Sequence, residues 1–231
     1  MIAWFASFTG PGALADADRA WLAKRIAATP GLRRGLIHTP ARTHDPYLDD
    51  GTPPPLALQL DFAEIAELEA AMALGGPLQG LAAPDALHSL RGAAVSQQAM
   101  LLRRFPVPDA AFRSAPGEAA CSYLVAYDGD APDLNAWLHH YVTGHTTVMA
   151  RFPGIRQIEV GTRLDWCGFL PWPRANCMLR NRVAFDSPDA LTAALNSPAR
   201  HEMRADFRRF PPFSARVTHF PMAAQTVMPA G

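Results

Sequence analysis

The sequence predicts an α+β protein made of two tandem copies of one unit, each ordered strand, helix, strand, strand, helix, strand. The first observation is a repeat, in which Pro30-Gly31-Leu32-Arg33 returns as Pro153-Gly154-Ile155-Arg156, 123 positions later. The second is that the same offset relates Phe62 to Phe185 and Leu68 to Leu191. The third is a match shifted by one residue, which sets Ala93, Val95, Ser96 and Met100 against Ala215, Val217, Thr218 and Met222.

The first copy is expected to span residues 1–107. Leu56, Leu58, Leu60 and Phe62 alternate with Ala57, Gln59 and Asp61, which is the period of a half-buried strand. By the same reasoning, strands are predicted over 2–8, 32–38, 56–62 and 92–105, and helices over 16–28 and 63–73. Residues 39–55 are expected to form a long, polar loop in solvent, and 75–90 an irregular or weakly helical segment.

The second copy is expected to span residues 120–222, after a linker over 108–119 and before a loose tail over 223–231. Asp130 is predicted to cap a helix that continues to Phe152, with Trp137, Tyr141 and His145 on its apolar face. Further predicted helices cover 190–196 and 199–210. Strands are predicted over 121–127, 155–164, 177–185 and 213–220.

This element order is the ferredoxin-like unit, a four-stranded antiparallel sheet with helices on one face. The other face of each sheet must also be buried. The simplest solution packs the two sheets against each other, which gives a barrel-like pseudo-dimer within one chain. The alternative is a homodimer in which each copy pairs with another chain.

Composition limits the function classes. The chain has 231 residues, 49% hydrophobic and 18% charged, with a formal net charge of zero, so a sizeable core is expected. No basic stripe points to nucleic acid, and no apolar run approaches the roughly 20 residues of a membrane span. Three cysteines without a CxxC pair argue against a disulfide framework and a structural zinc site. We expect a cytoplasmic protein.

Several motifs of the second copy occur in a familiar order: Trp137-Leu138-x-x-Tyr141-x-x-x-His145, Phe152-Pro153-Gly154-Ile155-Arg156, Phe185-Asp186-Ser187, Asp206-Phe207 and Val217-x-His219-x-Pro221-Met222. In this order they resemble EthD-like proteins, which belong to the dimeric α+β barrel superfamily. The resemblance implies small-molecule chemistry without fixing a reaction. The superfamily includes isomerases, cyclases, cofactor-free monooxygenases and, in some branches, haem enzymes. The first copy lacks the Tyr-x-x-x-His helix and resembles them in skeleton only.

Some aligned positions carry an apolar residue in the first copy and a polar residue in the second, and these polar residues are candidates for a functional role. His145 stands opposite Leu22, and Tyr141 opposite Asp18, on a helix face that should point toward the sheet. A phenol and an imidazole one turn apart can present themselves to one cavity and move a proton. The alternative is a core histidine bonded to a backbone carbonyl.

Two further polar positions lie on predicted strands. Asn181 aligns with Leu58, so it should lie on the helix side of the sheet beside His145. It could donate to a substrate oxygen, or it could hold His145 in one tautomer. His219 aligns with Gln97 and is either a second acid or base or a solvated surface histidine.

Aromatic residues are candidates for substrate contacts. Trp166 and Trp172 lie in a long loop that could cover a flat, apolar ligand or could instead be a packing plug. Trp137 and Phe207, from the motifs of the resemblance, complete the predicted substrate-binding set. Arg180 and Arg182 should face the other sheet, where they either pair with acids or bind an anion.

The polar loop over 39–55 carries a group of potential metal ligands, which are His38, His44, Asp45, Tyr47, Asp49 and Asp50. They follow no recognised ligand spacing, so we expect a solvated loop and no metal site.

The favoured function is a cofactor-independent enzyme of isomerase, cyclase or monooxygenase type, acting on a small, apolar, oxygenated molecule. Proton transfer would run through His145 and Tyr141, with the first copy as a degenerate scaffold. A second hypothesis is a non-catalytic protein that binds a small ligand or is structural. A third is a haem enzyme with His145 or His219 as axial ligand.

Overall fold

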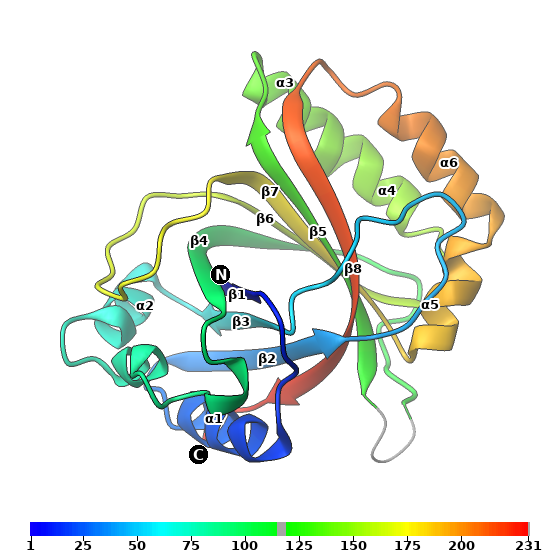
Figure 1. Ribbon diagram of the computed structural model, residues 1–231. Coiled ribbons are helices and arrows are strands. Elements are labelled where there is room, and N and C mark those ends of the chain that lie inside the picture. Colours follow the sequence, from blue (N-terminus) through cyan, green and yellow to red (C-terminus); the bar gives the residue numbers. More distant parts are fainter. Residues whose placement is uncertain (115–118, 231) are drawn as a thin grey trace.

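Eight antiparallel strands close into one barrel, and helices cover its outer surface (Figure 1). The computed structural model describes residues 1–114 and 119–230; residues 115–118 of the predicted linker lie outside the described part. The strands are β1 (Ile2–Thr9), β2 (Leu32–Pro40), β3 (Leu56–Phe62), β4 (Ala94–Phe105), β5 (Ala120–Asp130), β6 (Ile155–Arg163), β7 (Cys177–Phe185) and β8 (Ser214–Val227). The predicted α+β barrel, closed within one chain, is confirmed.

The order of strands around the barrel is β1-β3-β2-β8-β5-β7-β6-β4. The strands of the first half are therefore ordered β4-β1-β3-β2, and those of the second half β8-β5-β7-β6. The halves join where β2 pairs with β8 and where β4 pairs with β6.

The helices follow the predicted order with local differences. They are α1 (Asp16–Ala27), α2 (Ile65–Met72), α3 (Leu134–His140), α4 (Thr146–Met149), α5 (Pro188–Leu195) and α6 (Pro198–Phe207). A π-helical turn over Tyr141–His145 joins α3 to α4. Two short 3₁₀ helices, Pro77–Ala82 and His88–Leu90, form the segment predicted as irregular.

The two halves share fine backbone detail at the predicted repeat. Gly31 and Gly154 have φ angles of 76° and 75°, a left-handed conformation that glycine adopts without a steric penalty. Directly after them, the ladders β2–β3 and β6–β7 both shift register, between Leu32 and Arg34 and between Ile155 and Gln157. The offset seen in the sequence thus corresponds to the same turn and bulge in both halves.

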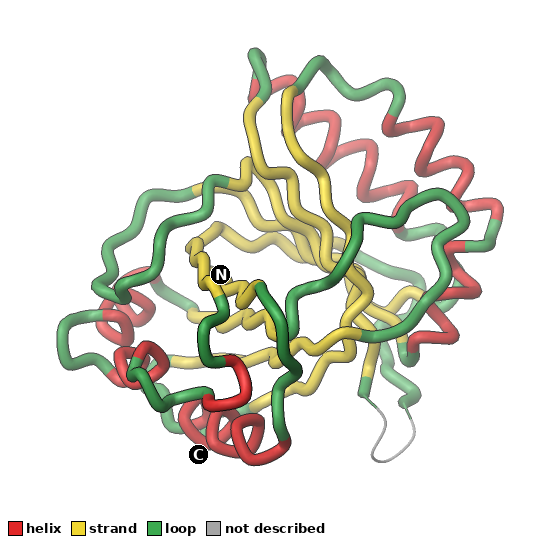
Figure 2. Tube along the Cα trace, in the orientation of Figure 1, coloured by secondary structure: helices red, strands yellow, loops and turns green. Residues whose placement is uncertain are grey.

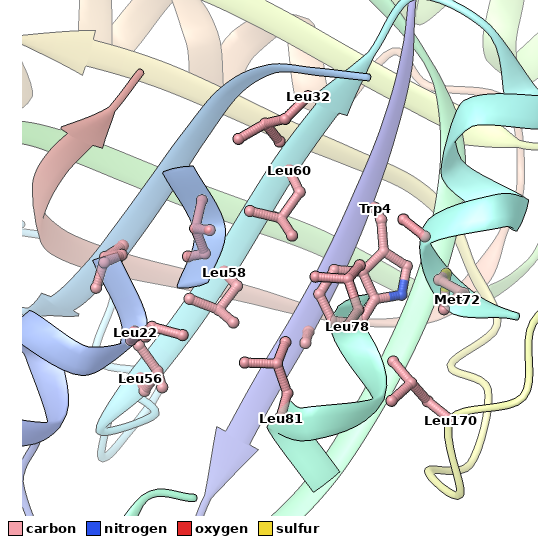
Figure 3. Close-up of a cluster of buried hydrophobic side chains, with 14 of the residues drawn as sticks. Trp4, Leu22, Leu32, Leu56, Leu58, Leu60, Met72, Leu78, Leu81 and Leu170 are labelled. Carbon is pink, nitrogen blue, oxygen red and sulfur yellow. The ribbon is translucent and has the colours of Figure 1, made fainter. Parts of the chain in front are cut away.

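Alternate residues of each strand face the helices or the barrel interior. On β3, Leu56, Leu58 and Leu60 belong to the apolar core of the first half, which packs under α1, α2 and the 3₁₀ segment (Figure 3). Burying these side chains stabilises the fold by about 1.5–3 kcal/mol each. A second core of the same kind lies between the second sheet and its helices.

The interior-facing residues include charged groups that meet across the halves. Glu159 of β6 accepts hydrogen bonds from Arg34 of β2 at 2.7 Å and from Arg182 of β7 at 3.1 Å. Burial raises the pKa of Glu159, but the guanidinium groups of Arg182 and Arg34 lower it more, so this pKa lies below its usual range. Pairing with an acid of the other half was one of the two alternatives for Arg180 and Arg182. The structure shows that Arg34 makes such an ion pair with Glu159, whereas Arg182 pairs with Glu159 within its own half.

Two predicted boundaries are wrong. β8 continues to Val227 because residues 223–227 pair with β2, so most of the predicted tail is strand. The first helix of the second half, α3, is capped by Asp133 and not by Asp130. The side chain of Asp133 accepts a hydrogen bond from the backbone amide of Ala136 at 2.8 Å. Among the described residues, no helix combines the length and apolar character needed to cross a membrane.

Candidate active site

A cavity of about 360 Å³ lies between the second sheet and the helices that cover it. His145, Asn181, His219 and Phe207, four of the predicted site residues, line it. Its walls are largely apolar or aromatic, with Val125, Tyr127, Met149, Phe152, Val183, Leu195, Met203 and Val217 among them. The volume is within the range of small-molecule pockets.

His145 is held by a carboxylate. It is the last residue of the π-helical turn, a type of insertion common at functional sites, and its Nδ1 lies 2.7 Å from Oδ2 of Asp206 on α6. Because a carboxylate only accepts, the neutral ring carries its proton on Nδ1. Nε2 makes no hydrogen bond to the described residues, so it is the nitrogen available to a ligand in the cavity.

The environment keeps this imidazole neutral near pH 7. Burial lowers the pKa of His145 to about 4, although the hydrogen bond and the charge of Asp206 act in the opposite direction. A carboxylate on Nδ1 also stabilises the imidazolium that forms when Nε2 takes up a proton. An imidazole held in this way by a carboxylate can act chemically as a general base through Nε2. The alternative of a histidine bonded to a backbone carbonyl is wrong.

His219 has the same arrangement with a carboxylate from the other half. Its Nδ1 lies 2.8 Å from Oδ2 of Asp50, and the same oxygen accepts the backbone N–H of His219 at 2.7 Å. Burial lowers the pKa of His219, while Asp50 opposes that shift. The interpretation of His219 as a solvated surface residue is wrong, because the side chain is partly buried beneath the loop that carries Asp50.

Tyr141 does not reach the cavity. It is fully buried, and its hydroxyl accepts a hydrogen bond from Nδ2 of Asn181 and is hydrogen-bonded to Tyr127. Burial raises the pKa of Tyr141 well above its usual value, so the phenol stays protonated. Tyr141 thus positions Asn181. Asn181 does not hold the tautomer of His145, since Asp206 does so, and Oδ1 of Asn181 is buried without a hydrogen-bond partner among the described residues.

The loop between β2 and β3 forms the roof of the cavity, so the prediction of a solvated loop holds for exposed residues such as Arg42, His44 and Asp49 but not for Asp45 and Asp50, which are partly buried. This roof loop, residues 41–55, leaves the barrel and runs beside α5 and α6 (Figure 2). Asp45 accepts from the Tyr123 hydroxyl and from Arg200 of α6, both at 2.8 Å. The ring of Tyr47 lies 4.0 Å from the guanidinium of Arg204. The first half therefore contributes side chains to the site of the second.

The corresponding loop of the second half, between β6 and β7, crosses to the first half and fills space there. The rings of Trp172 and Trp4 are stacked, with 6.3 Å between their centroids. Nε2 of Gln97 donates a hydrogen bond to the backbone carbonyl of Trp172 at 2.8 Å. Trp166 is buried in the core of the first half. Trp166 and Trp172 do not line the cavity, and their packing matches the alternative of a plug.

Sequence reasoning missed several residues of the site. Asp206 belongs to a motif of the resemblance, but nothing local connects it to His145, and Asp45 and Asp50 look like ordinary loop residues. Trp137, predicted to contact substrate, is fully buried against Tyr127 and Tyr141 and does not line the cavity. Among the described residues, no group of three or more His, Cys, Asp or Glu side chains is arranged to hold a metal ion.

Comparison with solved structures identifies the fold. An anthrone oxidase-like protein superposes with a TM-score of 0.63 at 14% identity, over 97% of this chain and 92% of its own. A candidate monooxygenase from Fusobacterium nucleatum superposes with a TM-score of 0.59 at 9% identity, over 100% and 95% of the two chains. This chain has the dimeric α+β barrel fold.

The predicted fold is therefore confirmed. An EthD family protein from Bacillus halodurans matches 42% of this chain and 96% of its own at 18% identity, with a TM-score of 0.34. No protein-family model and no curated protein sequence matches this chain. At these identities, fold similarity does not transfer a reaction, so function has to be argued from the cavity.

Proposed function

We propose that this protein is an enzyme that removes a proton from a carbon acidified by a carbonyl group, either next to it or conjugated with it through a ring, in a flat, apolar, oxygenated molecule. The observation that carries the proposal is the His145–Asp206 pair, with Nε2 of His145 left for a ligand in a cavity. A neutral imidazole of fixed tautomer in an apolar pocket is suited to accept a proton from carbon. The step itself needs no cofactor.

The bonds of the proposed step can be followed atom by atom. Nε2 of His145 takes the proton, the C–H electron pair forms a C=C bond, and the carbonyl π electrons move to oxygen to give an enolate; where a ring separates the two carbons, as in anthrone, the intervening ring π bonds shift between them. Arg200 lines the cavity, with its Nε buried and without a hydrogen-bond partner among the described residues, and its charge would stabilise this oxygen. The free Oδ1 of Asn181 would accept a hydrogen bond from a substrate hydroxyl.

Two outcomes are open to the enolate. Nε2 of His145 can return the proton that it took to a different carbon of the enolate, which is an isomerisation and restores the neutral imidazole. Alternatively the enolate reacts with dioxygen, which is the class of chemistry named for the fold neighbours. Proton removal is common to both routes.

The two-half construction supports a duplication in which one site was retained. We propose that each half is a ferredoxin-like unit. In the first half, Leu22 and Leu58 stand where the second has His145 and Asn181, and the tryptophans of the β6–β7 loop pack there. The first half is then more than a degenerate scaffold, because its roof loop supplies Asp45 and Asp50 to the site.

The proposal is tested by hydrogen exchange without oxygen. Anthrone in deuterium oxide, under anaerobic conditions, should gain deuterium at its acidic CH₂ carbon faster with the protein than in buffer. His145→Asn should abolish this acceleration, whereas the matched control His139→Asn, at an exposed position of the preceding helix, should retain it. Binding of anthrone without faster exchange would overturn the proposal in favour of a non-catalytic binding protein.

A further inference from the structure

The barrel interior holds a second cavity, about 500 Å³ in volume, on the opposite side of β5 and β7 from His145. Interior-facing side chains become more exposed toward one end of the barrel. On β5, Leu124 and Ala126 are half-buried and Asp128 is exposed, and on β1 the residue nearest that end, Thr9, is exposed. The cavity is therefore a well that opens at this end, and we call it the barrel well.

The charged side chains on the floor of the barrel well are already paired, whereas both ring nitrogens of His38 and Oε1 of Gln59 lack hydrogen-bond partners among the described residues. Arg182 donates to Glu159 at 3.1 Å and to the Ser122 hydroxyl at 3.2 Å. Glu159 also accepts from Nε2 of Gln59 at 3.1 Å. A ligand therefore gains little by displacing these ion pairs, and the charge of an anion has to be matched by a cation nearer the mouth.

Arg180 is the group without a matching charge. It is half-buried on β7 above the floor, and its guanidinium lies 5.7 Å from the ring of Phe5, which belongs to the first half. Its Nε is buried without a hydrogen-bond partner, and no carboxylate oxygen of the described residues lies within 4.0 Å of it. The neighbouring thiol of Cys177 is a weak acceptor.

The walls around Arg180 are apolar and aromatic, with Phe5, Leu124, Ala126 and Phe220 among them. Toward the mouth, Arg216 adds a second cation and Asp128 a single carboxylate, so the upper well has an excess of positive charge. A buried donor without an acceptor costs free energy, and a carboxylate is the acceptor that best matches a guanidinium.

From this arrangement we propose that the barrel well binds a small organic anion, with a flat apolar body between Phe5 and Phe220 and a carboxylate paired with Arg180. The site is separate from the cavity of His145, because the sheet strands β5 and β7 lie between them. It also does not depend on the proposed reaction.

Isothermal titration calorimetry with naphthoate and its neutral amide, naphthamide, tests the proposal on the full chain. Naphthoate should bind, and naphthamide should bind at least tenfold more weakly, because it lacks the charge. Arg180→Gln should weaken naphthoate binding by about 10- to 100-fold, the loss typical of a charge-assisted hydrogen bond. Asp128→Asn removes the one opposing carboxylate and should strengthen it.

Controls separate the barrel well from the candidate active site. Arg204→Gln changes the same residue type on the wall of the His145 cavity and should leave naphthoate binding unchanged, as should His145→Asn. The thermal unfolding midpoint of each variant shows whether it is folded. The proposal is overturned if naphthoate does not bind, if Arg180→Gln binds it as well as the unmodified chain, or if Arg204→Gln or His145→Asn abolishes binding.

Discussion

Replacing Asp206 by asparagine tests how the site makes a base out of His145. The carboxylate lies 2.7 Å from Nδ1, and the two side chains are only 5% and 13% exposed. When Nε2 takes up a proton, charges about 4 Å apart attract by about 4 kcal/mol at an effective dielectric constant of about 20. An amide of the same shape loses this attraction and can also turn the ring to the wrong tautomer.

We therefore expect Asp206→Asn to slow the anaerobic exchange of anthrone by about 10²- to 10⁴-fold. Stability should fall by only about 1 kcal/mol, because the amide still forms a hydrogen bond with the ring. Glu202→Gln is the matched control: it lies on the same helix, its ion pair with Arg151 is exposed, and its exchange rate should not change. If Asp206→Asn exchanged at the unmodified rate while His145→Asn did not exchange, the assigned role of Asp206 would be refuted.

Three further predictions concern buried polar groups. Burial lowers the pKa of His38 to about 3 and that of His145 to about 4, from 6.5; the unfolded chain then binds more protons, so the free energy of unfolding should fall as pH drops from 6.5 toward 4. His38→Leu should make this decrease smaller, as measured by urea unfolding at pH 6.5 and at pH 4. An unchanged difference between the two free energies of unfolding would contradict the prediction. Asn181→Leu, which copies Leu58 of the first half, should keep or raise the unfolding free energy, because it removes an unsatisfied Oδ1, yet slow exchange by at least tenfold; full exchange activity would exclude a substrate contact. Tyr141→Phe should slow exchange far less than His145→Asn in the same assay, and an equal loss would show that the phenol acts directly.

The strands and the barrel could be predicted from the sequence because the patterns that indicate them are local or periodic. Alternation along β3 marks which residues face the helices, and the glycine turns mark the repeat. Two buried faces per sheet then leave few arrangements other than closure. The end of β8 was not accessible, since residues 223–227 lack large apolar side chains and are ordered by pairing with β2 of the other half.

The candidate site was accessible only in part. Contrast between the copies selected His145 and Asn181, which line the cavity. The carboxylates that hold the two histidines of the cavity are distant in sequence: Asp206 is 61 positions from His145, and Asp50 is 169 positions from His219. Acidic residues in a polar loop give the same local pattern whether they are solvated or cross to another half. Long-range charge pairing therefore decides the site, and local sequence does not encode it.

Nitrogen-15 NMR of histidine-labelled protein tests the central claim most directly, because it reports which ring nitrogen of His145 carries the proton. The signals are assigned by their loss in His145→Asn. We predict a neutral ring with the proton on Nδ1 and a bare Nε2, from pH 7 down to about pH 4, where burial places the pKa. A proton on Nε2 at pH 7, or charging of the ring near pH 6.5, would contradict the account of His145 as the base.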